Sequence, residues 1–267
     1  MSDLLICIRC HKDFELILDT ISSVKWACPS SRVVCAVDNN PQLAEKLKKI
    51  LTPKGVYLSR RKFGWGVGLY CMLVESIKFF KEQFDFSHFM SIDTDTLFIA
   101  RKADELILNL VTSSQIGLIG NHVIVEPWVT RFKREKENLE RVFGKIPDSY
   151  TPGEGVQGGC MLITNAFLRE MEKRGHFSPP FSEAYKHTTI ADDHLISLFC
   201  RMCCLEIKGA FPLIHSQWRA SIDPKRLDPS KSVVFHPAKV RPGSGHESTE
   251  RAVRNFYRKQ RGLENLQ

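Results

Sequence analysis

The feature that most constrains this sequence is an alternation of β-favouring apolar runs with helical apolar stripes between residues 4 and 92. The apolar runs predict four strands, at 4–9, 32–37, 55–58 and 87–92. The helical stripes predict three intervening helices, at 14–24, 43–50 and 67–84. Strands that alternate with helices at this spacing favour an α/β fold, in which a mostly parallel sheet carries helices on both faces.

The alternation loosens beyond residue 115, although further elements can be predicted. The patterns there indicate strands at 115–125, 159–164 and 232–236 and helices at 131–142 and 192–203. A chain of 267 residues is long enough to bury one large core. We therefore predict a single domain over residues 1–240, followed by a basic helical tail over residues 241–267.

Composition narrows the classes of protein to which the chain could belong. The formal net charge of +8 indicates an anionic substrate or partner, such as a nucleotide diphosphate, an acidic glycan, an anionic lipid surface or a nucleic acid. No apolar stretch approaches the ~20 residues that span a bilayer, and the first residues do not resemble a signal peptide. We therefore expect a cytoplasmic protein. Its nine cysteines, odd in number and mostly within apolar runs, predict reduced thiols and no disulfides.

Polar residues follow the predicted parallel strands at the points where the strands end. Ligands of open α/β sheets bind outside the carboxyl ends of the strands, so these residues are expected to line one crevice. They are Arg9, Asp38, Arg60, Asp93 and Asp95. The strand-end argument makes Arg9 a candidate for binding the ligand even though it is far from the others in sequence.

Asp93 and Asp95 stand two residues apart, in the tripeptide Asp93-Thr94-Asp95, between the apolar runs 89–92 and 97–99. Two carboxylates at the point where a strand leaves a sheet offer oxygen ligands to Mn²⁺ or Mg²⁺. Such a cation can bridge the diphosphate of a substrate. Two aspartates at this spacing can also simply decorate a turn, and it is the flanking buried strands that favour a metal site here.

With this D-x-D motif after its fourth strand, the chain resembles the GT-A glycosyltransferases over roughly residues 4–236. The resemblance implies a Rossmann-like GT-A fold with a nucleotide-binding half at 1–100 and an acceptor half at 101–240. It also implies a metal-dependent, hexosyltransferase-like enzyme, which moves a sugar from a UDP- or GDP-sugar to a glycan or lipid-linked acceptor. Asp93 and Asp95 would hold the metal, and Asp93 would also face the donor.

The resemblance assigns further donor contacts before the D-x-D motif. Asp38 occupies the place of an acidic residue that contacts the base or the ribose, while an Asx-turn before Asn40-Pro41 is the alternative. A polar, glycine-containing segment would cover the donor, and one of its basic residues would face the diphosphate. The candidates in this segment are Arg60, Lys62, Gly64 and Trp65.

A second glycine-rich segment, at 153–160, overlaps the start of the strand predicted at 159–164. GT-A enzymes often place such a segment where the donor sugar meets the acceptor. The resemblance therefore makes Gln157 and Gly158 candidate donor contacts. A flexible connector is the alternative interpretation of this segment.

Asp192 and Asp193 open the apolar helix predicted at 192–203. An aspartate at a helix start is most often a cap, and Asp192 is the candidate for that role. The pair is similar to the acidic motif of inverting GT-A enzymes, in which a carboxylate takes the proton of the acceptor hydroxyl. Asp193 is the preferred base, and Asp192 is the second catalytic candidate. Many GT-A enzymes also supply a metal ligand from a late histidine, for which His236 is placed and His215 competes.

Three other interpretations find less support in the sequence. Cys7-Ile8-Arg9-Cys10-His11 matches the C-x-x-C-H haem-attachment pattern, but it ends a predicted strand and no export signal precedes it. A nucleotidyltransferase would share the sheet, yet it usually carries a glycine-rich basic loop directly after the first strand. The basic tail favours a nucleic-acid-binding protein, but the usual motifs are missing and we expect no nucleic acid. The tail is more simply a solvated helix, or one that rests on an anionic membrane.

Overall fold

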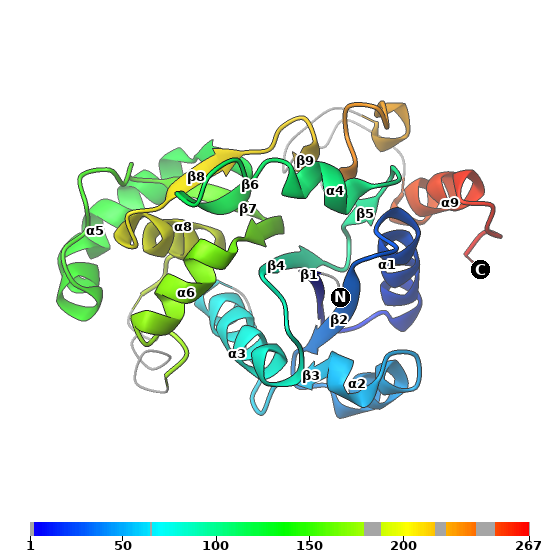
Figure 1. The fold of residues 1–267 in the computed structure, drawn as a ribbon, viewed down its shortest axis with the longest axis horizontal. Coiled ribbons are helices and arrows are strands. Elements are labelled where there is room, and N and C mark those ends of the chain that lie inside the picture. Colours follow the sequence, from blue (N-terminus) through cyan, green and yellow to red (C-terminus); the bar gives the residue numbers. More distant parts are fainter. Residues whose placement is uncertain (1–2, 65, 179–187, 217–222, 239–248, 267) are drawn as a thin grey trace.

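The centre of the computed structural model is a seven-stranded sheet with the strand order β3-β2-β1-β4-β7-β6-β8 (Figure 1). The structure describes residues 3–64, 66–178, 188–216, 223–238 and 249–266. The strands of the sheet are β1 (Leu4–Cys10), β2 (Arg32–Val37), β3 (Val56–Leu58), β4 (His88–Asp93), β6 (Ile116–Ile124), β7 (Glu154–Ile163) and β8 (Glu206–Gly209). Only the pairs that β7 makes are antiparallel, so the predicted, mostly parallel α/β sheet is confirmed.

A smaller sheet, with the strand order β5-β10-β9, joins the middle of the chain to a much later part. Its strands are β5 (Leu97–Phe98), β9 (Ile214–Ser216) and β10 (Val234–His236). β5 pairs antiparallel with β10, with Val234 opposite Phe98 and Phe235 opposite Leu97. This pairing returns the end of β10 to the carboxyl end of β4.

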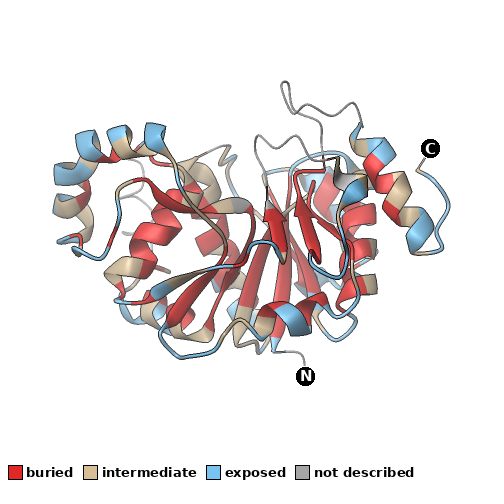
Figure 2. Ribbon diagram, turned by 90° about the horizontal axis from the view of Figure 1, so that it is seen from above, coloured by how far each residue is buried: buried red, intermediate tan, exposed pale blue. Residues whose placement is uncertain are grey.

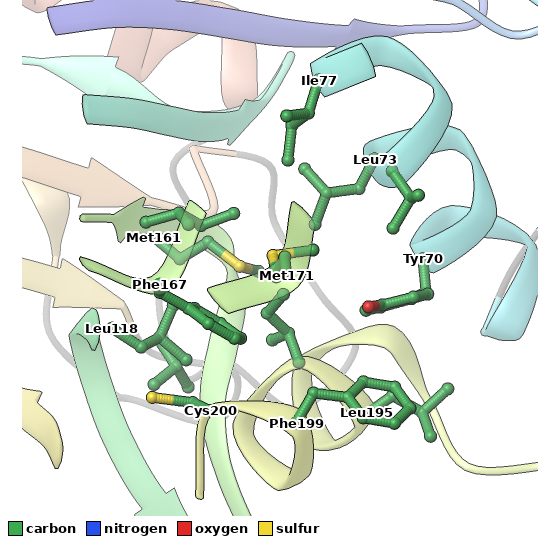
Figure 3. Close-up of a cluster of buried hydrophobic side chains, with 14 of the residues drawn as sticks. Tyr70, Leu73, Ile77, Leu118, Met161, Phe167, Met171, Leu195, Phe199 and Cys200 are labelled. Carbon is green, nitrogen blue, oxygen red and sulfur yellow. The ribbon is translucent and has the colours of Figure 1, made fainter. Parts of the chain in front are cut away.

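Helices cover both faces of the large sheet, as the sequence predicted (Figure 1). They are α1 (Phe14–Ala27), α2 (Pro41–Lys48), α3 (Val67–Gln83), α4 (Ala103–Leu108), α5 (Glu126–Phe143), α6 (Asn165–Lys173), α8 (Asp192–Met202) and α9 (Glu250–Gln260), with short 3₁₀ turns at Pro53–Gly55 and Pro224–Arg226. One face buries apolar side chains of α1, α2 and α4, and the other buries those of α3, α6 and α8. Figure 2 shows the buried strands between these layers, and Figure 3 shows side chains of α3, α6 and α8 meeting against the sheet.

The period of two in β1 and β4 sends alternate side chains to the two layers. Leu5 and Cys7 of β1 enter the layer of α3 and α8, whereas Ile8 and Cys10 enter the layer of α1 and α2. Cys7 and Cys10 therefore face opposite sides of the sheet, which is incompatible with joint attachment of a haem. All nine cysteines are free thiols and eight of them are buried.

The glycine-rich segment at 153–160 is not a flexible connector. β7 begins at Glu154, and its first residues pair with β6, so that Gly155 lies opposite Val123 and Val156 opposite His122. Glycine has a low β-propensity, which hides this half of the strand from a sequence pattern. α5 also begins earlier than predicted, at Glu126, because Pro127 is tolerated in a first helical turn. The sequence did not predict the short elements α4, α6, β8 and β9.

The C-terminal helix α9 packs against the rest of the chain (Figure 1). Val253 and Tyr257 bury their side chains against Leu97 and Ile99, and Arg254 has no exposed surface. The interpretation of the tail as a solvated helix is therefore wrong for this face of α9.

Within the part of the chain that the structure describes, no helix combines the length and the apolar character that a membrane crossing would require.

Candidate active site

The carboxyl end of β4 carries the one group of three metal-ligating side chains found among the described residues. Asp93, Asp95 and His236 each offer one ligand atom, and these atoms lie within 4.8 Å of one another. Nε2 of His236 is 3.3 Å from Oδ1 of Asp95 and 3.7 Å from Oδ2 of Asp93. Two carboxylates and an imidazole are a donor set that suits Mn²⁺ or a similar divalent cation. The residues thus fit the kind of ion that the sequence predicted.

The small sheet decides which late histidine reaches the two aspartates. Because β10 runs antiparallel to β5, His236 at its end lies beside the segment that joins Asp95 to β5. The amide of Ala238 donates a hydrogen bond of 2.7 Å to the carbonyl of Asp95, which holds the chain after β10 beside the aspartates. His215 lies on β9 opposite Phe235, and its ring stacks on that side chain at a centroid distance of 5.9 Å. The structure therefore brings His236, rather than His215, to the aspartates.

Gly159 of β7 leaves the space that the His236 ring occupies. A Cβ atom built on Gly159 would lie 2.0 Å from Nδ1 and 2.1 Å from Cγ of His236, far inside van der Waals contact. His236 is almost fully buried, with 1% of its surface exposed, so its ring cannot avoid such a Cβ atom by turning toward solvent. One reason for glycine in this segment is thus the close approach of a histidine that comes from much later in the chain.

Replacement of Gly159 by alanine is expected to lower the free energy of unfolding by about 1–3 kcal/mol, because the imidazole must move within a packed interior. The same movement displaces His236 from the aspartates, so affinity for Mn²⁺ should also fall. Urea unfolding and a Mn²⁺ titration measure these two effects. Gly209→Ala is the matched control, since a Cβ at this strand glycine has its nearest neighbour at 3.8 Å. Equal urea midpoints for Gly159→Ala and the wild type would contradict the steric argument.

Arg9 joins the Asp93 end of the site to the start of α8. Arg9 and Asp93 are register partners on the parallel strands β1 and β4, and their side chains point to the same face. Nε and Nη2 of Arg9 lie 2.9 and 2.8 Å from Oδ1 of Asp93, and Nη1 donates to Oδ2 of Asp192 at 2.6 Å. Burial would lower the pKa of Arg9, but the two carboxylates outweigh it and raise that pKa. Arg9 therefore stays charged in the interior.

Three aspartates, Asp93, Asp95 and Asp192, lie close to one arginine, Arg9, and this excess of carboxylates favours a further positive group. Burial raises the pKa of Asp93, and the charges of Arg9 and His236 do not fully offset it, in part because Asp95 and Asp192 repel the ionised form. An opposite charge within a few ångströms would favour the ionised carboxylates. A divalent cation between Asp93 and Asp95 would supply that charge.

Asp192 and Asp193 both lie in the first turn of α8, but they differ in their contacts. Asp192 is not the N-cap, because that position belongs to Ala191, and its carboxylate binds Arg9 instead. The interpretation of Asp192 as a side-chain cap is therefore wrong. Oδ1 of Asp193 accepts a hydrogen bond of 3.0 Å from the amide of His194, and 19% of its side chain is exposed. Burial and the charge of Asp192 raise the pKa of Asp193 to about 8.

A cleft of about 280 Å³ opens beside the aspartates at the carboxyl ends of β1, β2 and β4. Six of the residues singled out from the sequence line it, namely Arg9, Asp38, Lys62, Gly64, Asp93 and Asp95. The sequence argument missed five others, namely Cys10, His11, Leu69, Met72 and Thr94. Cys10 and His11 could have been found by the strand-end argument, because they end β1 and follow it. Leu69 and Met72 carry no such signal, since they come from one side of α3.

Asp38 organises the loop that forms one wall of the cleft. Its carboxylate accepts hydrogen bonds from the amide of Phe63 at 2.8 Å and from the amide of Gly64 at 3.3 Å. The alternative of an Asx-turn formed by Asp38 is wrong, because its carboxylate bonds to this distant loop; the local side-chain bond before α2 is the one that Asn40 accepts from the amide of Leu43. Asp38 therefore shapes the loop after β3 as well as lining the cleft.

The other described candidates from the sequence do not line this cleft. Arg60 is exposed and acts electrostatically on Tyr57, and it does not line the cleft. Gln157 accepts a hydrogen bond of 2.5 Å from the side chain of Asn121, and Gly158 lies in the same strand, β7. Trp65 lies outside the described residues.

A buried acidic network that the sequence did not reveal ties β7 to α8. Glu154, 2% exposed, accepts bonds of 3.0 and 2.6 Å from Arg201 and one of 2.9 Å from His122. Burial would raise the pKa of Glu154, but these hydrogen bonds lower it to about 2. Its carbonyl also lies 2.9 Å from Nδ1 of His194. The network helps to hold the start of α8, and its members are too far apart in sequence to be recognised from a pattern.

Solved structures identify the fold of the chain, whereas the sequence comparisons find no match. No protein-family model and no curated protein sequence matches the chain. Among solved structures, the galactosyltransferase LgtC in complex with donor and acceptor sugar analogs matches at 15% identity, over 98% of this chain and 97% of that one, with a TM-score of 0.51. Mouse xyloside xylosyltransferase 1 matches at 11% identity, over 88% of this chain and 98% of that one, with a TM-score of 0.51.

A third solved structure is considerably longer than this chain. The bifunctional glycosyltransferase WbbM matches at 13% identity and a TM-score of 0.50, over 90% of this chain. The chain spans about half the length of WbbM, since the match covers 46% of it. Together these likenesses show that the chain has the GT-A fold, the fold that its resemblance to nucleotide-sugar glycosyltransferases predicted.

Proposed function

We propose that this chain is a glycosyltransferase that moves a sugar from a nucleotide-diphosphate donor, a UDP- or GDP-sugar, to a hydroxyl of a glycan or lipid-linked acceptor. The observation that carries the proposal is the grouping of Asp93, Asp95 and His236 beside a cleft at the carboxyl edge of a GT-A sheet. Arg9 and Lys62 line that cleft together with three aspartates, so an anionic diphosphate would bind there with a cation between it and the carboxylates. The solved LgtC structure, whose fold is similar, contains donor and acceptor sugar analogs.

In this proposal Asp93, Asp95 and His236 hold a divalent cation, Mn²⁺ or Mg²⁺. The cation would neutralise the diphosphate as it leaves the sugar. Asp38 positions the Phe63–Gly64 loop against the donor, and Lys62 offers a positive charge to the phosphates from the same wall. Arg9 keeps Asp93 and Asp192 in place through its ion pairs with both carboxylates.

Asp193 is the proposed general base. Its carboxylate takes the proton of the acceptor hydroxyl, and the hydroxyl oxygen forms a bond to the anomeric carbon. The bond from that carbon to the diphosphate oxygen breaks at the opposite side, so the configuration inverts. A carboxylate with a pKa of about 8 is well matched to this role near neutral pH, because a base works best when its pKa lies close to the working pH.

The pH dependence of transfer is expected to report on Asp193. Its raised pKa means that the carboxyl is protonated below about pH 8, and only the ionised form can accept the proton. The value of kcat/KM should therefore rise with pH through about 8. Asp193→Asn should remove this limb and lower kcat by about 10²–10⁴-fold, with donor binding unchanged. Steady-state kinetics across pH measure both effects.

Asp85→Asn is the control for that variant, because it makes the same chemical change at an exposed site. An Asp193→Asn enzyme that keeps the wild-type pH profile would contradict the assignment of the base. A product that retains the anomeric configuration of the donor would also contradict it.

A thermal-shift screen tests the function as a whole. A ligand that binds only the folded protein raises the melting temperature in proportion to ln(1 + [L]/Kd). We expect UDP- or GDP-sugars to raise it with Mn²⁺ present and to have little effect without the ion. Stabilisation by nucleoside triphosphates alone would favour a nucleotidyltransferase instead. No stabilisation by any nucleotide sugar with Mn²⁺ would contradict the proposal.

A further inference from the structure

The Asp93-Thr94-Asp95 turn is held at its middle residue by a side chain of the last helix. Arg254 of α9 is completely buried, and its Nη2 donates a hydrogen bond of 2.5 Å to the carbonyl of Thr94. Thr94 is the middle residue of the turn, between the two aspartates. A residue 160 positions later in the chain thus binds the backbone of the metal turn.

The other contacts of Arg254 fix the guanidinium in the orientation that this bond needs. Nη1 donates to Oδ2 of Asp19 at 2.9 Å and to Oγ1 of Thr20 at 3.2 Å, and Nε donates to Glu250 at 2.9 Å. The hydroxyl of Thr20 also donates to the carbonyl of Thr94, at 2.6 Å. One carbonyl therefore receives two donors, from α9 and from α1, which lie side by side in Figure 1.

Apolar packing joins α9 to the segment that follows the turn. Val253 and Tyr257, on either side of Arg254 in sequence, bury their side chains against Leu97 and Ile99. The bond from Arg254 to Thr94 and the apolar contacts with Leu97 and Ile99 thus fall on one continuous piece of chain, from Thr94 to Ile99. This pattern indicates that α9 supports the turn, in addition to closing the end of the fold.

We propose that Arg254 is a positioning residue for the metal site, because its hydrogen bond to the Thr94 carbonyl orders the turn that carries the two aspartates. The peptide group between Thr94 and Asp95 is planar, so a fixed Thr94 carbonyl fixes the plane from which the Asp95 Cα–Cβ bond departs. The turn also contains a hydrogen bond of 3.1 Å from the amide of Thr96 to the carbonyl of Asp93. A turn that is already ordered loses less conformational entropy when its carboxylates bind a cation.

This inference rests on the proposed metal site, and its test measures metal binding and turn mobility directly. The variants are Arg254→Lys, Thr20→Val and, as a matched control, Arg258→Lys. Arg258 lies on the same helix and also binds Asp19, at 3.0 Å, while its other hydrogen bond goes to the carbonyl of Glu264. Lysine keeps the positive charge beside Asp19, but it has no guanidinium fork with which to reach Thr94 at the same time.

The first measurement is a titration of the purified full chain with Mn²⁺, in which the free ion is followed by electron paramagnetic resonance. The second is amide hydrogen exchange at Thr96 without metal. We expect Arg254→Lys and Thr20→Val to weaken Mn²⁺ binding about tenfold and to speed exchange at Thr96 by a similar factor. Arg258→Lys should stay within about twofold of the wild type in both measurements.

Two results would overturn the inference alone. Wild-type Mn²⁺ affinity and exchange in both Arg254→Lys and Thr20→Val would show that the turn does not need the contact. Equal losses in Arg258→Lys and Arg254→Lys would assign the effect to docking of α9 in general. A wild-type protein that binds no Mn²⁺ would instead overturn the proposed metal site, and the inference with it.

Discussion

Replacement of Asp95 by alanine is expected to reduce sugar transfer by on the order of 10³-fold or more and to abolish stabilisation by Mn²⁺. Asp95 is 4% exposed and lies 3.3 Å from His236, so it offers the most enclosed carboxylate of the proposed metal site. A bound cation contributes several kcal/mol of charge stabilisation to a departing diphosphate, and about 1.4 kcal/mol corresponds to a factor of ten in rate. Turnover of a nucleotide sugar and the Mn²⁺-dependent shift of the melting temperature measure the two effects.

The metal-free stability of the same variant separates this explanation from simple misfolding. Two carboxylates close together repel each other, so the loss of Asp95 should leave the melting temperature without metal within a few degrees of the wild type. Asp85→Ala, at an exposed site, is the control for the loss of one carboxylate. An Asp95→Ala protein that is folded and still transfers sugar at the wild-type rate would refute the metal assignment.

Replacement of Asp19 by asparagine is expected to have the largest effect on stability. Its side chain has no exposed surface and receives three arginines of the C-terminal part, namely Arg254 at 2.9 Å, Arg258 at 3.0 Å and Arg261 at 2.6 Å. Arg254 would keep its ion pair with Glu250, but Arg261, with 1% of its side chain exposed, would lose its carboxylate. Removal of one partner from a buried ionic network costs about 3–5 kcal/mol, because it leaves buried charge without full compensation. The melting temperature should fall by roughly 10 °C.

The location of this effect is also predicted. Because the three arginines come from α9 and the residue just after it, Asp19→Asn should release the helix before the sheet unfolds. Limited digestion with trypsin should then cut within residues 250–261, and urea unfolding should report the lost free energy. Glu15→Gln, an exposed change on the same helix α1, is the matched control. A change of less than about 1 kcal/mol in Asp19→Asn would mean that α9 is held by its apolar face alone.

Release of α9 should also affect the proposed metal site, because Arg254 binds the Asp93-Thr94-Asp95 turn. If Arg254 positions Thr94, then Asp19→Asn should weaken Mn²⁺ binding as well as stability, since Asp19 orients the guanidinium. Mn²⁺ affinity and protease resistance should therefore fall together in this variant. A helix that is released while Mn²⁺ affinity stays unchanged would separate the two roles of α9.

Much of the fold could be predicted because most of its strands and helices show apolar residues at strand or helix spacing within a few residues of one another. The runs 4–8 and 33–37 are apolar throughout, as expected of parallel strands buried on both faces. β7 could not be predicted in full, because its first half contains glycines that are there for their neighbours. Gly155 of this half makes room for the ring of His194, just as Gly159, within the predicted run 159–164, makes room for the ring of His236, and both histidines come from later elements.

The candidate site divides in the same way. Asp93 and Asp95 could be found because a pair of carboxylates directly after an apolar strand is a local pattern, and the strand-end argument placed Arg9 and Asp38 near them. That argument does not say what each side chain binds. Asp38 holds the amides of Phe63 and Gly64, which only the path of the loop after β3 determines.

The sequence by itself determined the α/β class, the mostly parallel sheet and the position of two aspartates at its carboxyl edge, because these depend on patterns within a few residues. Only the tertiary structure decided that His236 rather than His215 meets those aspartates, that Arg9 bridges Asp93 and Asp192, and that Arg254 reaches Thr94. Each of these contacts joins residues 84 to 183 positions apart, or follows from the register of two short strands. Such contacts depend on how elements pack and pair, which the local pattern of a single sequence does not encode.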